Sequence, residues 1–242
     1  AIASVHPAIE IVSSRWSDWL AVGVWQDKPY SGPAPELLAR LRDGGDFSAN
    51  TAAGDGGGAL FGYNAHLAVS GGRYHENSGA NGGAIRLSSG TATIVGVDFT
   101  ANTATGYGGA IYTDLGTVSA TGGSFIGNSA DSGGAIFSGA NASITGGTYV
   151  GNAAVAGGAI YGNGDLVSVT GGSFTDNTAG SNGGAIWTAV DVSVAGSDFT
   201  TNTATGAGGL PGGFLPSFFA CSAAASHFFS ASACAAFAFS KS

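Results

Sequence analysis

Apolar and polar residues alternate in short segments along most of this chain. In Leu166–Thr170, for example, apolar residues alternate with hydroxyl residues, which is the two-residue period of a strand with one buried face. Such segments recur at intervals of 24 to 27 residues, and glycine-rich stretches separate them. The pattern predicts many short strands in a chain built from repeats.

Two signatures mark each repeat. One is Gly-Gly-Ala followed by Leu or Ile, and it begins at Gly57, Gly82, Gly108, Gly133, Gly157 and Gly183, with a shorter Gly-Gly-Leu at Gly208. The other is an aromatic residue with asparagine three positions later, and it begins at Phe47, Tyr74, Phe99, Phe125, Tyr149, Phe174 and Phe199. A unit this short cannot bury its own apolar face, so neighbouring units must stack.

The repeat fits a coil of three short strands. The position five residues before the aromatic residue is apolar, and the position six before it mostly carries a hydroxyl. A parallel stack places like residues about 4.8 Å apart, so these positions form columns, as do the aromatic residues and the Ile of the first signature. The asparagines fit an amide ladder at a corner, where asparagine tolerates left-handed backbone, and the paired glycines fit corners that need positive φ or close approach. We therefore predict an all-β parallel β-helix of about seven coils.

This alternation of GGAI and FxxN resembles the repeat of the chlamydial polymorphic outer membrane proteins and related surface proteins. The resemblance covers about residues 44 to 210. It implies a right-handed parallel β-helix, or solenoid, that is exposed on a surface and used in adhesion. An extracellular or cell-surface location is expected on the same ground.

The repeats divide the chain into three segments. We predict a cap over residues 1–43, β-helix repeats over 44–209 and a tail over 210–242. Residues 34–43 predict a short helix, because Pro35 suits its first turn, Gly44 and Gly45 end it, and three leucines share one face. A cap is expected because a solenoid exposes unpaired strand edges at its ends. Since the chain begins without Met, we expect a processed or truncated product.

Charge narrows the choice of partner. The chain holds 44 glycines, only 9% charged residues and a formal net charge of −8. From Leu87 to Ser240 there are seven aspartates and no Lys or Arg. We therefore expect no nucleic-acid partner and no anionic membrane partner for the repeats.

The tail differs from the repeats. Its phenylalanines lie among alanines and serines over residues 214–239 and would cover about half of a helix. The tail either packs on the rod or closes its last coil, or it docks to a partner or a membrane. The sequence does not decide whether Cys221 and Cys234 form a disulfide. A continuous helix would separate them by about 20 Å, so a disulfide would require a bent or non-helical tail.

Candidate catalytic residues are few. Asp165 and Asp191 each follow a GGAI isoleucine by five residues, so they are candidates for a stacked carboxylate pair of the kind that retaining glycosidases use. No Arg, Lys or His lies near them in the sequence, and coincidence in two loops is the simpler interpretation. We predict no enzyme activity, and a polysaccharide-active enzyme ranks third among the functions considered.

Ion-pair and metal-binding candidates are equally sparse. Asp46, Arg73 and Asp98 occupy one column and fit an outward ion-pair ladder, which contributes little when solvated. His66 and His75 have no third ligand candidate, so we predict no metal site and no cofactor.

The residue after the GGA-Leu/Ile unit is mostly aromatic. In chain order these residues are Phe61, Arg86, Tyr112, Phe137, Tyr161 and Trp187. Because they follow inward isoleucines, strand alternation predicts that they point outward. We predict that this exposed stripe binds a partner protein or a glycan, unless the tail or a broad corner covers it.

A second column carries hydroxyl groups. Three repeats contain Ser-x-Thr, and the residues are Ser119, Thr121, Ser143, Thr145, Ser168 and Thr170. Their two rows resemble the flat threonine arrays of β-solenoid ice-binding proteins. We predict a non-catalytic surface or assembly module that is adhesin-like or structural, with ice binding as the alternative function.

Overall fold

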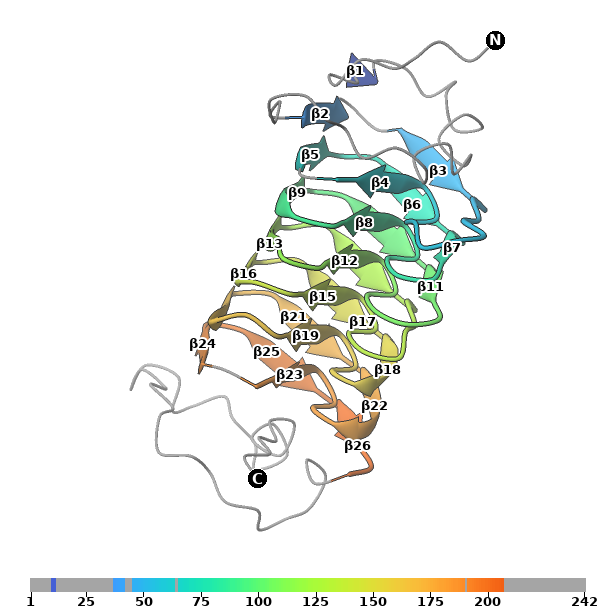
Figure 1. Cartoon of the computed structure of the whole chain (residues 1–242). Coiled ribbons are helices and arrows are strands. Elements are labelled where there is room, and N and C mark those ends of the chain that lie inside the picture. Colours follow the sequence, from blue (N-terminus) through green and yellow to red (C-terminus); the bar gives the residue numbers. More distant parts are fainter. Residues whose placement is uncertain (1–9, 12–36, 42–44, 64, 190, 207–242) are drawn as a thin grey trace, which may run out of the picture.

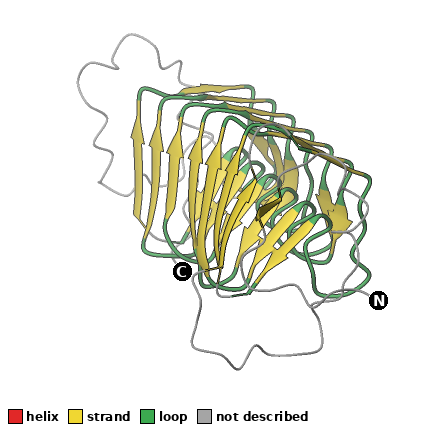
Figure 2. Cartoon of the chain, turned by 90° about the horizontal axis from the view of Figure 1, so that it is seen from above, coloured by secondary structure: helices red, strands yellow, loops and turns green. Residues whose placement is uncertain are grey.

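The chain folds as a right-handed parallel β-helix in which every described element is a strand (Figure 1). The computed structural model describes residues 10–11, 37–41, 45–63, 65–189 and 191–206. Strands of successive coils lie side by side and pair in parallel around one interior (Figure 2). The six strands of the smallest of three long sheets mark about six complete coils. The predicted all-β solenoid is therefore confirmed, with about six complete coils among the described residues where the repeat count predicts about seven.

Three sheets and one narrow corner ladder make up the coil. The eight-stranded sheet contains β1 (Glu10–Ile11), β2 (Leu37–Leu41), β5 (Ala65–Ser70), β9 (Gly90–Val95), β13 (Thr117–Thr121), β16 (Ala142–Thr145), β20 (Leu166–Thr170) and β24 (Asp191–Ala195). The seven-stranded sheet contains β3 (Asp46–Ser48), β6 (Arg73–His75), β10 (Asp98–Thr100), β14 (Ser124–Ile126), β17 (Thr148–Val150), β21 (Ser173–Thr175) and β25 (Asp198–Thr200). The six-stranded sheet contains β4 (Leu60–Gly62), β8 (Ile85–Leu87), β12 (Ile111–Thr113), β15 (Ile136–Ser138), β19 (Ile160–Gly162) and β23 (Ile186–Thr188). The corner ladder contains β7 (Ser78–Gly79), β11 (Thr103–Ala104), β18 (Ala153–Ala156), β22 (Thr178–Asn182) and β26 (Thr203–Ala204).

The core consists of columns of like residues, as the repeat predicts. The GGAI isoleucines pair in register and are buried, for example Ile111, Ile136 and Ile160. On the eight-stranded sheet, Ile144 and Val169 also pair and are buried, whereas the hydroxyl residues beside them point outward. Alternation along each short strand therefore decides which side chains enter the interior.

An inner aromatic ladder runs through the seven-stranded sheet. The aromatic residues of the second signature stack with ring centroids 4.5 to 5.0 Å apart, and they are Phe47, Tyr74, Phe99, Phe125, Tyr149, Phe174 and Phe199. All of them are buried. Parallel strand spacing of about 4.8 Å brings offset-stacked rings to their preferred separation without further adjustment.

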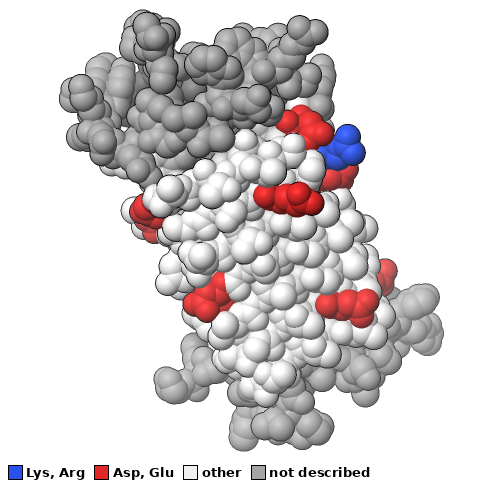
Figure 3. Space-filling model, turned by 90° about the vertical axis from the view of Figure 1, so that its right-hand side faces the viewer, with Lys and Arg blue, Asp and Glu red and all other residues white. Residues whose placement is uncertain are grey.

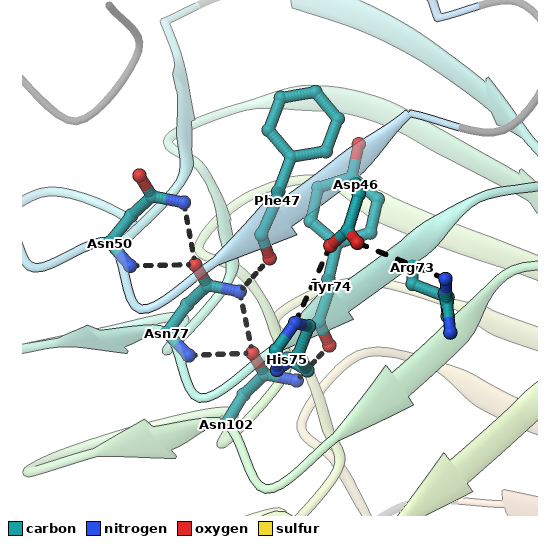
Figure 4. Close-up of polar contacts among 8 residues, drawn as sticks. All are labelled: Asp46, Phe47, Asn50, Arg73, Tyr74, His75, Asn77 and Asn102. Carbon is teal, nitrogen blue, oxygen red and sulfur yellow. Dashed lines mark hydrogen bonds and ion pairs between the residues drawn. The ribbon is translucent and has the colours of Figure 1, made fainter. Parts of the chain in front are cut away.

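The asparagines form the predicted amide ladder at the next corner (Figure 4). Asn77 Nδ2 donates to Asn102 Oδ1 at 2.9 Å and to the backbone oxygen of Phe47 at 2.8 Å. The backbone N–H of Asn77 also donates to Asn102 Oδ1, at 3.1 Å. The same bonds recur from coil to coil, and the last described member is Asn202. Each amide therefore joins three consecutive coils.

The left-handed backbone at this corner falls one residue before each asparagine. The non-glycine residues with positive φ, at 52° to 55°, are Ala49, Glu76, Ala101, Asp176 and Thr201. Gly127 and Gly151 fill this position in the other two coils. Our expectation that the asparagine itself takes this conformation is wrong, because its backbone N–H must face the next coil to complete the ladder.

The paired glycines meet two separate constraints. Gly108 has φ of +62°, and a Cβ atom there would lie 2.1 Å from the Ile111 carbonyl oxygen. Gly109 has no positive φ, but a side chain would not fit there. A Cβ atom at Gly109 would lie 2.0 Å from the Gly134 carbonyl oxygen of the next coil. The first glycine permits the turn, and the second permits adjacent coils to approach.

The helix predicted over residues 34–43 is wrong where the structure describes it. Leu37–Leu41 is strand β2, which pairs in parallel with β5 and on its other side with β1. Ala39 and Leu41 pair in register with Leu67 and Val69. Pairing the backbone groups of a sheet edge outweighs a helical period that only three leucines support.

Two tyrosine hydroxyls in the inner ladder generate a stability prediction. Within the described residues, Tyr74 Oη and Tyr149 Oη are buried without a hydrogen-bond partner, and burial raises the pKa of both phenols. Tyr149→Phe should raise the free energy of unfolding by about 1 to 3 kcal/mol, because it removes an unsatisfied polar group and keeps the stacked ring. Phe125→Ala, which removes a ring from the same ladder, should lower it by about 3 to 5 kcal/mol. Denaturant unfolding checks both values, and a loss of stability in Tyr149→Phe would contradict the assignment.

Candidate binding surfaces

A column of planar side chains runs along the outside of the six-stranded sheet. This outer ladder consists of Phe61, Arg86, Tyr112, Phe137, Tyr161 and Trp187, paired in register. Ring centroids lie 5.2 Å apart between Tyr112 and Phe137 and 4.9 Å apart between Phe137 and Tyr161. The ring centroids of Tyr161 and Trp187 lie 4.3 Å apart. The structure thus brings every residue of the predicted stripe into one stack.

The centre of the outer ladder is much less exposed than alternation alone suggests. Tyr112 and Phe137 are only 7% and 8% exposed, whereas Phe61, Tyr161 and Trp187 are half-buried. Each ring lies against the next, so stacking covers the ring faces. The expectation of an exposed stripe is therefore wrong for Tyr112 and Phe137 and holds in part at the ends of the ladder, and the alternative of partial burial at a corner applies to its centre.

Tyr107 is a further cause of this burial, and strand alternation does not predict its contribution. Its ring stacks on Tyr112 at 5.8 Å and tilts against Phe137 at 4.9 Å, while the residue itself remains 42% exposed. Tyr107 comes from the corner that precedes Gly108, where side chains follow no strand alternation. An aromatic residue directly before Gly-Gly was the available signal.

A guanidinium takes the place of a ring in the outer ladder. Arg86 Cζ lies 5.4 Å from the Phe61 ring centroid and 5.7 Å from that of Tyr112. Arg86 pairs with the Asp55 carboxylate and donates to the Asp55 carbonyl oxygen. Hydrogen bonding from Arg86 holds the pKa of the Asp55 carboxyl below its usual value, so the pair is ionised and locally neutral. A planar cation can continue an aromatic stack, which an ammonium group cannot do as well.

Asn81 connects this ion pair to Tyr107. Its Nδ2 donates to Asp55 Oδ1 at 2.9 Å, and its Oδ1 accepts from the backbone N–H of Tyr107 at 3.1 Å. Asp55, Asn81 and Tyr107 lie on three successive coils at the same corner. These three residues together with Arg86 are termed the corner cluster.

The phenols of the outer ladder stay neutral at physiological pH. Burial raises the pKa of Tyr112 to about 12, and the charge of Asp114 and a hydrogen bond to it add to the shift. Burial also raises the pKa of Tyr161. The outer ladder therefore offers aromatic surface and neutral hydroxyls, and its single cation is paired with Asp55.

The hydroxyl residues of the eight-stranded sheet form the two predicted rows. Thr121, Thr145 and Thr170 pair in register and are exposed. Ser119, Ser143 and Ser168 pair beside them, with Ser143 the most open. Strands β9, β13, β16 and β20 contain no Lys, Arg, Asp or Glu. On these four strands the face is therefore an uncharged array of hydroxyl side chains.

Charged side chains on the seven-stranded sheet lie in solvent. Arg73 Nη2 lies 3.9 Å from Asp46 Oδ2, and His75 Nε2 lies 3.5 Å from Asp46 Oδ1 (Figure 4). Asp98 pairs with Arg73 in strand register, and its carboxylate accepts from the Ser124 hydroxyl at 2.6 Å. The Arg73 and Asp46 side chains are 69% and 47% exposed, so their ion pair contributes little. Carboxylates are scattered over the face drawn in Figure 3, and most of that surface is uncharged.

The carboxylate pair that the sequence suggested does not form. In the parallel register Asp191 lies opposite Leu166, so Asp165 is offset by one residue. The chain between strands β19 and β20 is one residue longer than the corresponding connection in the next coil, and this shifts Asp165 along the stack. The prediction that Asp165 and Asp191 stack as a carboxylate pair is therefore wrong.

The two histidines lie on different sheets. His66 belongs to strand β5, and His75 belongs to strand β6. Across the described ranges, no three His, Cys, Asp or Glu side chains come together as metal ligands would. In the same part of the chain, no helix has the length and apolar character needed to cross a membrane. The Phe-rich segment 214–239, Cys221 and Cys234 lie outside the described residues.

Comparison with known proteins identifies one family of repeats. Residues 96–114 and 171–189 each match the Chlamydia polymorphic membrane protein repeat. Both matched segments begin just before an aromatic–asparagine signature and extend past the following GGAI, so each covers one corner and one residue of the outer ladder, Tyr112 or Trp187. No curated protein and no solved structure matches the chain significantly.

Proposed function

We propose that this chain is a non-catalytic, adhesin-like module, located at a cell surface or outside the cell, that binds a protein or glycan partner through the outer ladder. The observation that carries the proposal is the position of that ladder. The inner aromatic ladder and the isoleucine columns already close the interior, so the core does not require a second aromatic column on the outside.

The accessible parts of the outer ladder suit recognition. Phe61, Tyr161 and Trp187 are half-buried and Tyr107 is 42% exposed, so these four residues remain partly accessible to solvent. Their neighbours hold these rings in place, and aromatic anchors lose little rotamer entropy on binding. A preorganised surface of this kind retains more of its contact energy as affinity.

Two further observations support the location and the absence of catalysis. The matched repeat is one of membrane proteins by its description, which favours a surface role for this chain. The candidate carboxylates Asp165 and Asp191 are out of register, and the Asp46 ion pair is solvated, so neither offers the convergent polar groups of an active site.

The test compares Trp187→Ala with Leu115→Ala. Trp187 closes the described end of the outer ladder, whereas Leu115 is 76% exposed and lies outside it. Trp187→Ala should weaken binding of the labelled full chain to cultured epithelial cells by about 10- to 100-fold, and Leu115→Ala should leave binding unchanged. Flow cytometry measures binding, and denaturant unfolding verifies that both variants fold. Equal binding by the two variants would refute the role of the ladder.

Ice binding is a second candidate, supported by the in-register hydroxyl rows on an uncharged sheet. Here the wild type should shape ice crystals and give thermal hysteresis, and Thr145→Tyr should abolish both because it interrupts one row at its centre. Thr100→Tyr alters another exposed threonine, on the seven-stranded sheet, and should change neither. Ice crystals that grow unmodified in micromolar wild-type protein would remove this candidate.

A further inference from the structure

We propose that the corner cluster is a binding site for an uncharged pyranose unit of a glycan. The inference rests on the proposed role of the outer ladder and commits it to one class of partner. It places the most specific contacts at Asp55, Asn81 and Tyr107, beside the ladder and outside the residues that strand alternation identified.

Tyr107 supplies an apolar platform for the sugar. Its ring lies 20° from the plane of Tyr112 and is also held by Phe137 at 4.9 Å, while 42% of the residue stays exposed. One side of the residue is therefore fixed against the ladder and the remainder is available to a ligand. The C–H face of a pyranose packs on such a ring through apolar contact, with little ordering of the protein.

Asp55 and Asn81 supply an acceptor and a donor next to each other. Asp55 Oδ1 is occupied by Arg86 and by Asn81 Nδ2 at 2.9 Å, but Oδ2 has no partner among the described residues and the side chain is 69% exposed. Asn81 Nδ2 uses one N–H group on Asp55 and retains a second. A donor beside an acceptor matches two neighbouring sugar hydroxyls, each of which can donate and accept.

The polar groups are also held in orientation. The backbone N–H of Tyr107 donates to Asn81 Oδ1 at 3.1 Å, which fixes the direction of the amide. Arg86 forms an ion pair with the Asp55 carboxylate, and Arg86 is itself stacked between Phe61 and Tyr112. A ligand therefore meets side chains whose rotamers are already restricted.

Charge selects a neutral sugar over an acidic one. The Arg86 cation is neutralised by Asp55, and only 9% of Arg86 is exposed, so little of it can reach a ligand carboxylate or sulfate. The chain carries a net charge of −8, which repels acidic glycans further. The small, fixed polar group of Asp55 and Asn81 also fits a sugar better than it fits the broad apolar patch of a protein interface.

The experiment measures oligosaccharide binding to the full chain by isothermal titration calorimetry. The neutral probes are cellotetraose, chitotetraose, maltotetraose and mannotetraose, and the acidic probe is a heparin-derived tetrasaccharide. We expect at least one neutral probe to bind, and Tyr107→Ala and Asn81→Ala each to weaken it about tenfold. Tyr63→Ala and Asn163→Ala, which alter an exposed tyrosine and an exposed asparagine outside the cluster, should leave it unchanged.

Tyr107→Leu distinguishes loss of binding from loss of folding. Leucine keeps apolar cover over Tyr112 and Phe137 but lacks the ring, so this variant should retain the wild-type unfolding midpoint and still lose affinity. Preference for the heparin fragment, or neutral binding that survives Tyr107→Leu, would overturn the inference. If no probe binds while Trp187→Ala still lowers cell binding, the glycan site is refuted and the ladder binds a protein. If Trp187→Ala has no effect either, the proposed function fails with it.

Discussion

The rest of the structure depends on the asparagine ladder. At the central position, Asn128 Nδ2 donates to the Phe99 carbonyl oxygen and to Asn152 Oδ1, both at 3.0 Å. Asn128 Oδ1 accepts from the backbone N–H of Asn102 at 3.0 Å and from Asn102 Nδ2 at 2.9 Å. All four hydrogen-bonding positions of this fully buried amide are thus satisfied, and they are satisfied only when the coils are in register. A slip of one residue would leave several buried polar groups unpaired.

Register at this corner determines both aromatic ladders. The inner ladder lies three residues before the asparagines, so its rings inherit the same alignment. The chain then turns through paired glycines that allow adjacent coils to approach, and it places each isoleucine inside and the following planar residue outside. The position of the outer ladder is therefore a geometric consequence of a polar ladder on the other side of the corner.

The sequence predicts columns well because parallel stacking converts a repeat along the chain into neighbours in space. Both aromatic columns, the asparagine ladder and the hydroxyl rows followed from spacing alone. The sequence predicts poorly whatever depends on corners and ends. The Asp165 offset comes from one additional loop residue, and the cover that Tyr107 gives to Phe137 comes from a side chain outside any strand. Strand β2 replaced a predicted helix because its neighbour β5 presents an edge that must be paired.

The most direct test of this account is the free energy of unfolding of Asn128→Ala, with Asn163→Ala as the reference. The substitution leaves the Asn102 backbone N–H, Asn102 Nδ2 and the Phe99 carbonyl oxygen without their ladder partner. At about 1 to 3 kcal/mol for each orphaned buried group, the account predicts a loss of about 3 kcal/mol or more. Asn163 is exposed at another corner, and its replacement should change stability by less than about 0.5 kcal/mol. Equal stability of the two variants would contradict the claim that the asparagine ladder holds the coils in register.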